Sequence, residues 1–198
     1  MTLFEWIFLL GLVATEVVRM PHRLRIRQLM REGRIVRMAA RRQDVALDML
    51  AYVGMAVIPL VYLFSPWLDF ANTPLPGWLG WLGTALMVIS LAVLVLAHRA
   101  LGKNWSPTLH VLPEHKLVTD GIYHHIRHPI YASIWLALIA QAMLLPNWLA
   151  GLAGIWLFLP VWVTRLPREE QMMLDTFGEA YLSYMSRTGQ VLPRLKRG

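Results

Sequence analysis

Apolar residues are grouped along this chain into long runs that polar, basic stretches separate. A helix needs roughly 20 apolar residues to cross a bilayer, and residues 46–68 and 77–98 each form such a run. Residues 3–18 form a shorter apolar run that contains two glutamates. The pattern predicts three membrane-spanning helices in the N-terminal half, residues 1–98.

The C-terminal half contains a longer uncharged stretch. Residues 130–164 carry no Asp, Glu, Lys or Arg, and they are too long for one span. The pair Pro146-Asn147 interrupts them and is typical of a turn. Two short spans, 130–145 and 148–164, are therefore expected. With five spans in total, the sequence predicts an all-α integral membrane protein.

The positions of the basic residues predict the orientation of these spans. All 19 Lys and Arg residues fall within residues 19–45, 99–129 and 165–198, which five spans place on one side of the membrane. Basic residues favour cytoplasmic loops. We therefore expect an N-terminus outside and a cytoplasmic C-terminus, with a bacterial inner membrane as the location.

Composition narrows the class of protein further. Charged residues make up 16% of the chain, whereas soluble domains carry about 25%. The net charge of +7 is explained by topology, and no nucleic-acid-binding module is present. The chain has no cysteine, which excludes thiolate metal sites. One domain, residues 1–198, is expected, with a catalytic region over residues 99–198.

The basic segment 19–44 alternates Arg with Leu, Ile, Met and Val. This pattern predicts one or two short helices on the membrane surface, interrupted near Gly33, that bind anionic membrane lipids. A role in gating the entry of a substrate is the alternative.

The densest polar and aromatic cluster is GIYHHIRHPIYAS, residues 121–133, which closes a long polar segment before the fourth span. Loops of such length in compact domains are usually functional. Pro129 can occupy the first helical turn, which places His128 and Tyr131 on one face, three residues apart. Capping of the helix by His128 is the structural alternative.

Five of the seven histidines lie within residues 110–128, so a metal site has to be considered. The adjacent pair His124 and His125, followed by His128, would converge poorly on one ion, and Arg127 would repel a cation. We therefore predict no metal, and we expect His124 and His125 to be solvated.

The tail is expected to contain a short helix that begins at Pro167 and has Glu169 and Glu170 in its first turn, where the helix dipole favours acids. Arg165 would then lie across a chain break from Glu169. The helix would bear an apolar stripe of Phe177, Tyr181 and Tyr184, and residues 187–198 would lie along the membrane.

EHKLVTDGIYHHIRHPIY, followed by RLPREEQMMLDTFGEAYLSYMSRTGQVLP, resembles the isoprenylcysteine carboxyl methyltransferase family, whose wider set includes phospholipid N-methyltransferases. The resemblance covers residues 101–193. It implies S-adenosylmethionine as a donor bound from the cytoplasmic side by a loop and a C-terminal helix, with S-adenosylhomocysteine as the product. The chain lacks the Gly-rich turn of a Rossmann fold, in agreement.

The resemblance also implies roles for individual residues. Arg165 matches the arginine at the acceptor's carboxylate, and the sequence departs from the family pattern at Thr108, Ile122, Ser133 and Pro167. The implied donor contacts are His115, Lys116, Leu117, Val118, Tyr123, His128, Pro129, Ile130, Tyr131 and Glu169.

The function expected from the resemblance is O-methylation of the carboxylate of an amphiphilic, isoprenylcysteine-type acceptor, with Arg165 and Glu170 as the catalytic candidates. A carboxylate is ionised at neutral pH and needs no general base. A phospholipid or other amine acceptor would need one, with Glu170 or His124 as candidates and Arg165 on a phosphate. Thiol methylation is a third alternative. A membrane scaffold or transporter subunit is the alternative that would bind no S-adenosylhomocysteine.

Overall fold

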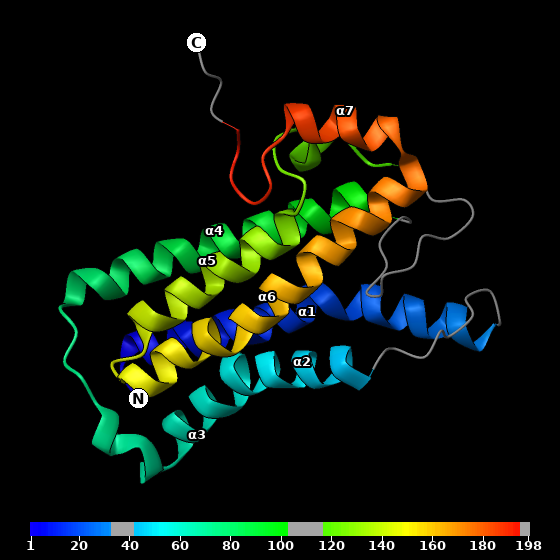
Figure 1. The fold of residues 1–198 in the computed structure, drawn as a ribbon. Helices are drawn as coiled ribbons and strands as arrows, with labels where there is room; N and C mark the ends of the chain where they lie inside the picture. The colour runs from blue at the N-terminus through cyan, green and yellow to red at the C-terminus, as the bar shows by residue number, and fades with distance from the viewer. Residues whose placement is uncertain (33–41, 103–116, 195–198) are drawn as a thin grey trace.

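The fold was obtained as a computed structural model, which describes residues 1–32, 42–102 and 117–194. It is a bundle of five antiparallel helical passes followed by a helix that lies across one end (Figure 1). The elements are α1 Leu3–Arg31, α2 Arg42–Tyr52, the π-helical turn η1 Val53–Val57, α3 Ile58–Phe64, the 3-10 turn η2 Pro66–Ala71, α4 Gly77–Leu101, the 3-10 turn η4 Gly121–His124, α5 Pro129–Leu144, α6 Trp148–Phe177 and α7 Glu179–Arg187.

Three of the passes are long and apolar enough to cross a membrane, and they cover Gln43–Phe64, Gly77–Leu101 and Trp148–Phe177. α5 is a shorter apolar helix, and α1 supplies the fifth pass. No strand occurs in the ranges that the structure describes. The predicted class of all-α integral membrane protein is thus confirmed.

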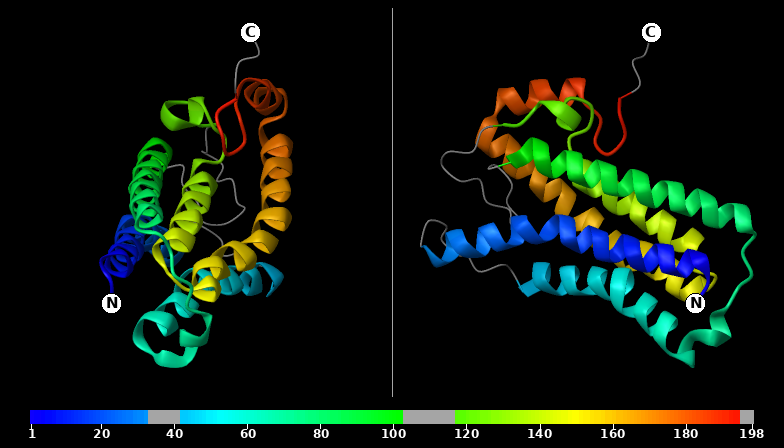
Figure 2. Two further views of the ribbon diagram at one scale, coloured as in Figure 1. Left: turned by 90° about the vertical axis from the view of Figure 1, so that its left-hand side faces the viewer. Right: turned by 180° about the vertical axis from the view of Figure 1, so that it is seen from behind.

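Helix α5 lies in the middle of the bundle, between α4 and α6 (Figure 2). α1 packs on the α4 side, and α2 with η1 packs on α6. Gly54 of η1 permits the second contact, because a Cβ there would lie 2.6 Å from the carbonyl oxygen of Ala153. The buried Gln141 of α5 bridges the same place by donating to the carbonyls of Gly54 and Ala150, at 3.0 and 2.7 Å.

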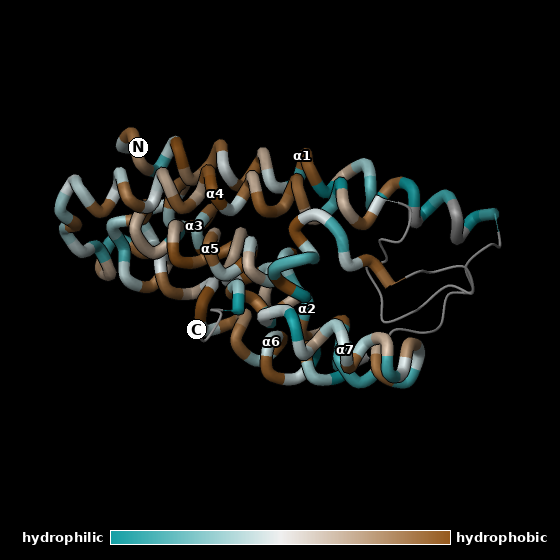
Figure 3. Tube along the Cα trace, turned by 90° about the horizontal axis from the view of Figure 1, so that it is seen from above, coloured by the Kyte–Doolittle hydropathy of each residue, from teal (hydrophilic) through white to brown (hydrophobic). Residues whose placement is uncertain are grey.

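The bundle has two unlike ends. We call the end that carries α7, together with the C-terminal ends of α1, α4 and α6, the basic end. The other, which carries the N-terminus and residues 65–76 and 145–147, is the turn end (Figure 1). Hydropathy changes along α1 from apolar to polar toward the basic end (Figure 3).

Asn147 fastens the turn end. Its buried side chain donates to the carbonyl of Leu68 at 2.7 Å and to Oδ1 of Asn72 at 3.0 Å. Its own Oδ1 accepts from the backbone N–H of Ala150 and caps α6. The tight turn expected at Pro146-Asn147 is confirmed, and it is joined to the loop before α4.

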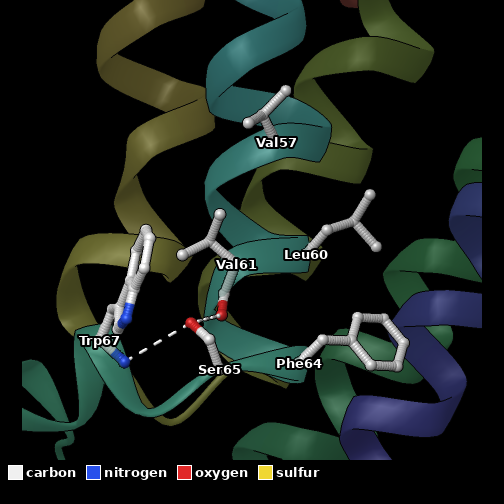
Figure 4. Close-up of a pocket in the computed structure, with 6 residues that line it drawn as sticks. All are labelled: Val57, Leu60, Val61, Phe64, Ser65 and Trp67. Carbon is white, nitrogen blue, oxygen red and sulfur yellow. Dashed lines mark hydrogen bonds between the residues drawn. The ribbon is translucent and has the colours of Figure 1, made fainter.

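An apolar hollow also lies at the turn end, between α3 and η2 (Figure 4). Ser65 ends α3 there, since its hydroxyl donates to the carbonyl of Val61 and accepts from the backbone N–H of Trp67. The lining residues are Val57, Leu60, Val61, Phe64, Ser65 and Trp67.

Two expectations for helix boundaries were wrong. α1 does not end near residue 18 but continues through Pro21 to Arg31, so the start of the basic segment is a continuation of the first helix. α6 runs without a break through Pro160 and Pro167, so no separate helix begins at Pro167. Neighbouring helices and side chains can compensate for the backbone hydrogen bonds that proline removes from a membrane helix.

Candidate active site

The N-terminal end of α5 and the C-terminal part of α6 meet at the basic end. His128 precedes α5 and Pro129 occupies its first turn, as expected. The His128 side chain makes no capping hydrogen bond, so the capping interpretation was wrong. Instead, its Nε2 lies 3.2 Å from Oε1 of Glu170, and its ring lies 5.9 Å from that of Tyr131 between centroids. The predicted shared face of these two residues is confirmed.

Glu169 is the centre of the first carboxylate cluster. Its Oε1 accepts from the hydroxyl of the buried Tyr131 at 2.9 Å and from Nε of Arg165 at 2.8 Å. Arg165 and Glu169 are four residues apart on one continuous helix, so they face the same side. The sequence placed them on either side of a break, whereas an unbroken α6 aligns them through helical geometry.

Glu170 has a different set of partners. Its Oε1 accepts from Nε and Nη2 of Arg127, both at 3.1 Å, in addition to its contact with His128. Arg127 also donates to the backbone carbonyls of Met185 and Thr188, at 3.3 and 2.6 Å. Arg127 therefore joins the loop before α5 to α6 and to the end of α7. Sequence reasoning gave it no such role.

The described part of the tail docks on the loop before α5, a contact that the sequence does not indicate. The backbone N–H groups of Arg127 and His128 donate to the carbonyls of Gly189 and Gln190, at 2.8 and 2.9 Å. The hydroxyl of Tyr184 in α7 donates to the carbonyl of Tyr123 at 2.6 Å. Burial raises the pKa of the Tyr184 phenol, so the group stays protonated as this donor.

An aromatic cluster leads from Glu169 into the bundle. Trp162 of α6 lies 5.6 Å from Tyr131 and 5.8 Å from Trp135 between ring centroids. Phe158 lies one turn further along and contacts Tyr131 and Trp135, at 6.2 and 5.4 Å. These four residues, here called the aromatic wall, line one interface between α5 and α6. The sequence shows their helical spacing, but not that the two stripes face each other.

Arg165 has a second acidic partner, which comes from the N-terminal half. Its Nη1 lies 3.2 Å from Oδ1 of Asp48 in α2. A parallel pair joins Arg168 to Asp44, also at 3.2 Å. No sequence pattern indicates this role for Asp48, because its partner is 117 residues away in sequence.

The remaining predicted site residues have various positions. Tyr123 and Pro129 are buried, Leu117, Val118 and Ile130 are half-buried, and His124 and His125 are exposed as expected. His115, Lys116 and Thr108 lie outside the described residues.

The cluster suits a sulfonium methyl donor chemically. Both hydrogen bonds of Glu169 end on Oε1, and Oε2 lies 3.9 Å from Nδ1 of His128. Oε2 therefore retains the capacity to accept from an ammonium or hydroxyl group. The rings of His128 and Tyr131 lie beside this carboxylate, and aromatic faces attract cations.

Comparison with known proteins shows similarity to one family of methyltransferases. Residues 81–175 match the model of the isoprenylcysteine carboxyl methyltransferase (ICMT) family. The human protein-S-isoprenylcysteine O-methyltransferase is 30% identical over 69% of this chain and 51% of its own length. The Arabidopsis thaliana protein-S-isoprenylcysteine O-methyltransferase B is 26% identical over 59% of this chain and 60% of its own length.

A Schizosaccharomyces pombe protein-S-isoprenylcysteine O-methyltransferase is 31% identical over 40% of this chain and 34% of its own length. The match with the human relative spans about half of that protein's length. The matched region contains α5 and both glutamates of α6, whereas Asp48 lies outside it. Through residues 81–175, this integral membrane protein is similar to the isoprenylcysteine carboxyl methyltransferase family.

Proposed function

We propose that this protein transfers a methyl group from S-adenosylmethionine to the carboxylate of an amphiphilic acceptor at the cytoplasmic face of the membrane. The observation that carries the proposal is the cluster of Arg165, Glu169 and Tyr131 at the end of the aromatic wall. It lies within the region that matches the ICMT family. A cationic donor and an anionic, apolar-tailed acceptor would each find a complementary group there.

The donor would be held from the basic end. Glu169 would accept from its ammonium or a hydroxyl group through Oε2, while His128 and Tyr131 present ring faces to the sulfonium. The segment 115–118 would frame the adenine, as the family resemblance implies. When bound, the donor supplies an electrophilic methyl group on a sulfur that leaves with the bonding electron pair.

The acceptor would enter from the bilayer along the aromatic wall, with its carboxylate near Arg165. A carboxylate attacks without losing a proton, so positioning is the main task, and it can contribute roughly 7–11 kcal/mol at best. Glu170 would act as a positioning residue rather than a base. Its Oε1 already accepts hydrogen bonds from Arg127 and His128. If Glu170 took a proton from the acceptor, these hydrogen bonds would have to break.

The acceptor test is an incubation of the purified protein with donor labelled in the methyl group. N-acetyl-S-farnesylcysteine, its methyl ester and phosphatidylethanolamine would be supplied separately. Label should enter only the free acid, and base should release it as methanol. Label in the phospholipid amine would replace this proposal with N-methylation. An absence of any binding of S-adenosylhomocysteine in calorimetry would favour the scaffold interpretation.

A further inference from the structure

Arg165 is shared by two carboxylates of unequal exposure. Glu169 binds its Nε at 2.8 Å from the same helix, and Asp48 binds its Nη1 at 3.2 Å from α2. The Asp48 side chain is 59% exposed, against 21% for each of the other two. One terminal nitrogen of the guanidinium, Nη1, is thus bound by the more exposed of the two carboxylates.

An acceptor carboxylate has the same chemistry as Asp48. Exposed ion pairs contribute little to stability, so Asp48 can be displaced at small cost. A guanidinium between two carboxylates is already neutralised, so a third carboxylate would meet net repulsion unless one of them moved away. Glu169 is fixed by Tyr131 as well as by Arg165, which leaves Asp48 as the one that moves.

The surroundings of Asp48 permit that movement. Asp44, one turn earlier in α2, pairs with Arg168 at 3.2 Å, so α2 stays attached to α6 when Asp48 leaves.

We propose that Asp48 is an internal stand-in for the acceptor's carboxylate, which holds Arg165 between turnovers and thereby sets the selectivity for anionic acceptors. The inference rests on the proposed function. Methylation would remove the acceptor's charge, so the ester product would lose its hold on Arg165 and Asp48 would return. Asp48 would therefore oppose binding of the acid and assist release of the ester.

The test compares Asp48→Asn with Asp44→Asn as the matched control, because the control breaks an equivalent pair without touching Arg165. Equilibrium binding of N-acetyl-S-farnesylcysteine and of its methyl ester would be measured in the presence of S-adenosylhomocysteine. Asp48→Asn should tighten binding of the acid by about two- to fivefold, the factor that corresponds to an exposed ion pair. It should leave the ester unchanged, and Asp44→Asn should change neither.

Steady-state kinetics give an independent test of the proposal. In Asp48→Asn the KM for the acid should fall by a similar factor while the KM for the donor stays the same, and Asp48→Glu should restore wild-type values. Weaker acid binding in Asp48→Asn would overturn the proposal, because Asp48 would then hold Arg165 in its working position. An equal increase in affinity for the ester would also overturn the proposal, because it would show that the substitution only weakened the packing of α2 on α6.

The two proposals fail differently. If the wild-type protein binds acid and ester equally well and methylates neither, the carboxylate acceptor itself is wrong and Asp48 has no role to play. If the wild type prefers and methylates the acid but Asp48→Asn leaves acid binding unchanged, only the inference about Asp48 falls.

Discussion

Glu169 and Glu170 are neighbours in sequence but point about 100° apart on α6, and their partners differ accordingly. Glu169 faces Tyr131 and Arg165, next to the aromatic wall. Glu170 faces Arg127 and the loop before α5. One carboxylate is thus available to ligands, while the other fastens the elements that form the site.

Glu169→Gln keeps the shape of the side chain and removes its charge. We expect the affinity for S-adenosylhomocysteine to fall by about 1.5–3 kcal/mol, as for a hydrogen bond to a charged group. Titration calorimetry on the detergent-solubilised protein measures this. Asp175→Asn is the control, since Asp175 is exposed on the same helix and bonded only to Gln171 among the described residues. Equal affinities in both variants would assign Glu169 a structural role.

Tyr131→Phe keeps the ring contacts of the aromatic wall but removes the hydrogen bond to Glu169. This substitution and His128→Ala should each raise the KM for the donor several-fold, and each variant should keep nearly the thermal stability of the wild type. His124→Ala should remain close to wild type, because His124 is exposed and a carboxylate acceptor needs no base. Loss of turnover in His124→Ala with intact donor binding would favour an amine acceptor.

For single residues, the sequence predicted the positions of His128 and Tyr131 at the start of α5 and of Glu169 and Glu170 in the tail, because motif spacing and helical geometry are local. It did not predict the partners Arg127, Trp162 and Asp48. Their contacts join segments far apart in the chain, and only the packing of α2, α5 and α6 brings them together.

The elements around the site depend on one another. α6 carries the acidic pair past Pro167 as one helix. This contradicts the expected break, which rested on the preference of proline for the first helical turn. Arg165, before Pro167, pairs with Glu169 of the same helix, and Arg168, after it, pairs with Asp44 of α2. These ion pairs keep the helix continuous through the proline. Tertiary contacts of this kind cannot be found from local propensity.

Arg127→Gln tests how the tail is attached. The substitution removes the charge that links Glu170 to the carbonyls of Met185 and Thr188. Residues 179–190 should then exchange amide hydrogens at least about tenfold faster, as expected when a charged hydrogen-bond partner is lost. Hydrogen–deuterium exchange would measure this, with α4 as the internal reference. Equal protection of α7 in the variant would mean that Tyr184 and the backbone pairing suffice.

For the molecule as a whole, hydropathy and charge predicted five antiparallel passes and the single end at which the basic segments gather, because both follow from the cost of burying polar groups in lipid. They could not predict that the tail folds back onto the loop before α5. Part of that contact is made by backbone groups, which carry no side-chain signature, and the rest by Arg127 and Tyr184, whose partners are backbone carbonyls far away in sequence.

The orientation in the membrane can be measured directly. Reporters fused after residue 198 and within residues 19–45 should be active in the cytoplasm, and one inserted near Asn72 should be active outside. The reason is that all 19 Lys and Arg residues fall within residues 19–45, 99–129 and 165–198, which the five predicted spans place on one side of the membrane. A C-terminal reporter that is active only outside would reverse the assignment of the donor-binding face.

The short length of α5 has a consequence for the bilayer itself. Its 16 residues rise about 24 Å, whereas a hydrocarbon core is about 30 Å thick. Because α5 lies between α4 and α6, its start at His128 should lie below the headgroups of a thick bilayer, and a thinner bilayer should bring headgroups and water closer to it. Turnover should be faster in vesicles of dimyristoleoyl- than of dierucoyl-phosphatidylcholine, because a thick membrane pays the full mismatch. Equal rates in both would mean that the surrounding helices, not the lipids, absorb the difference in thickness.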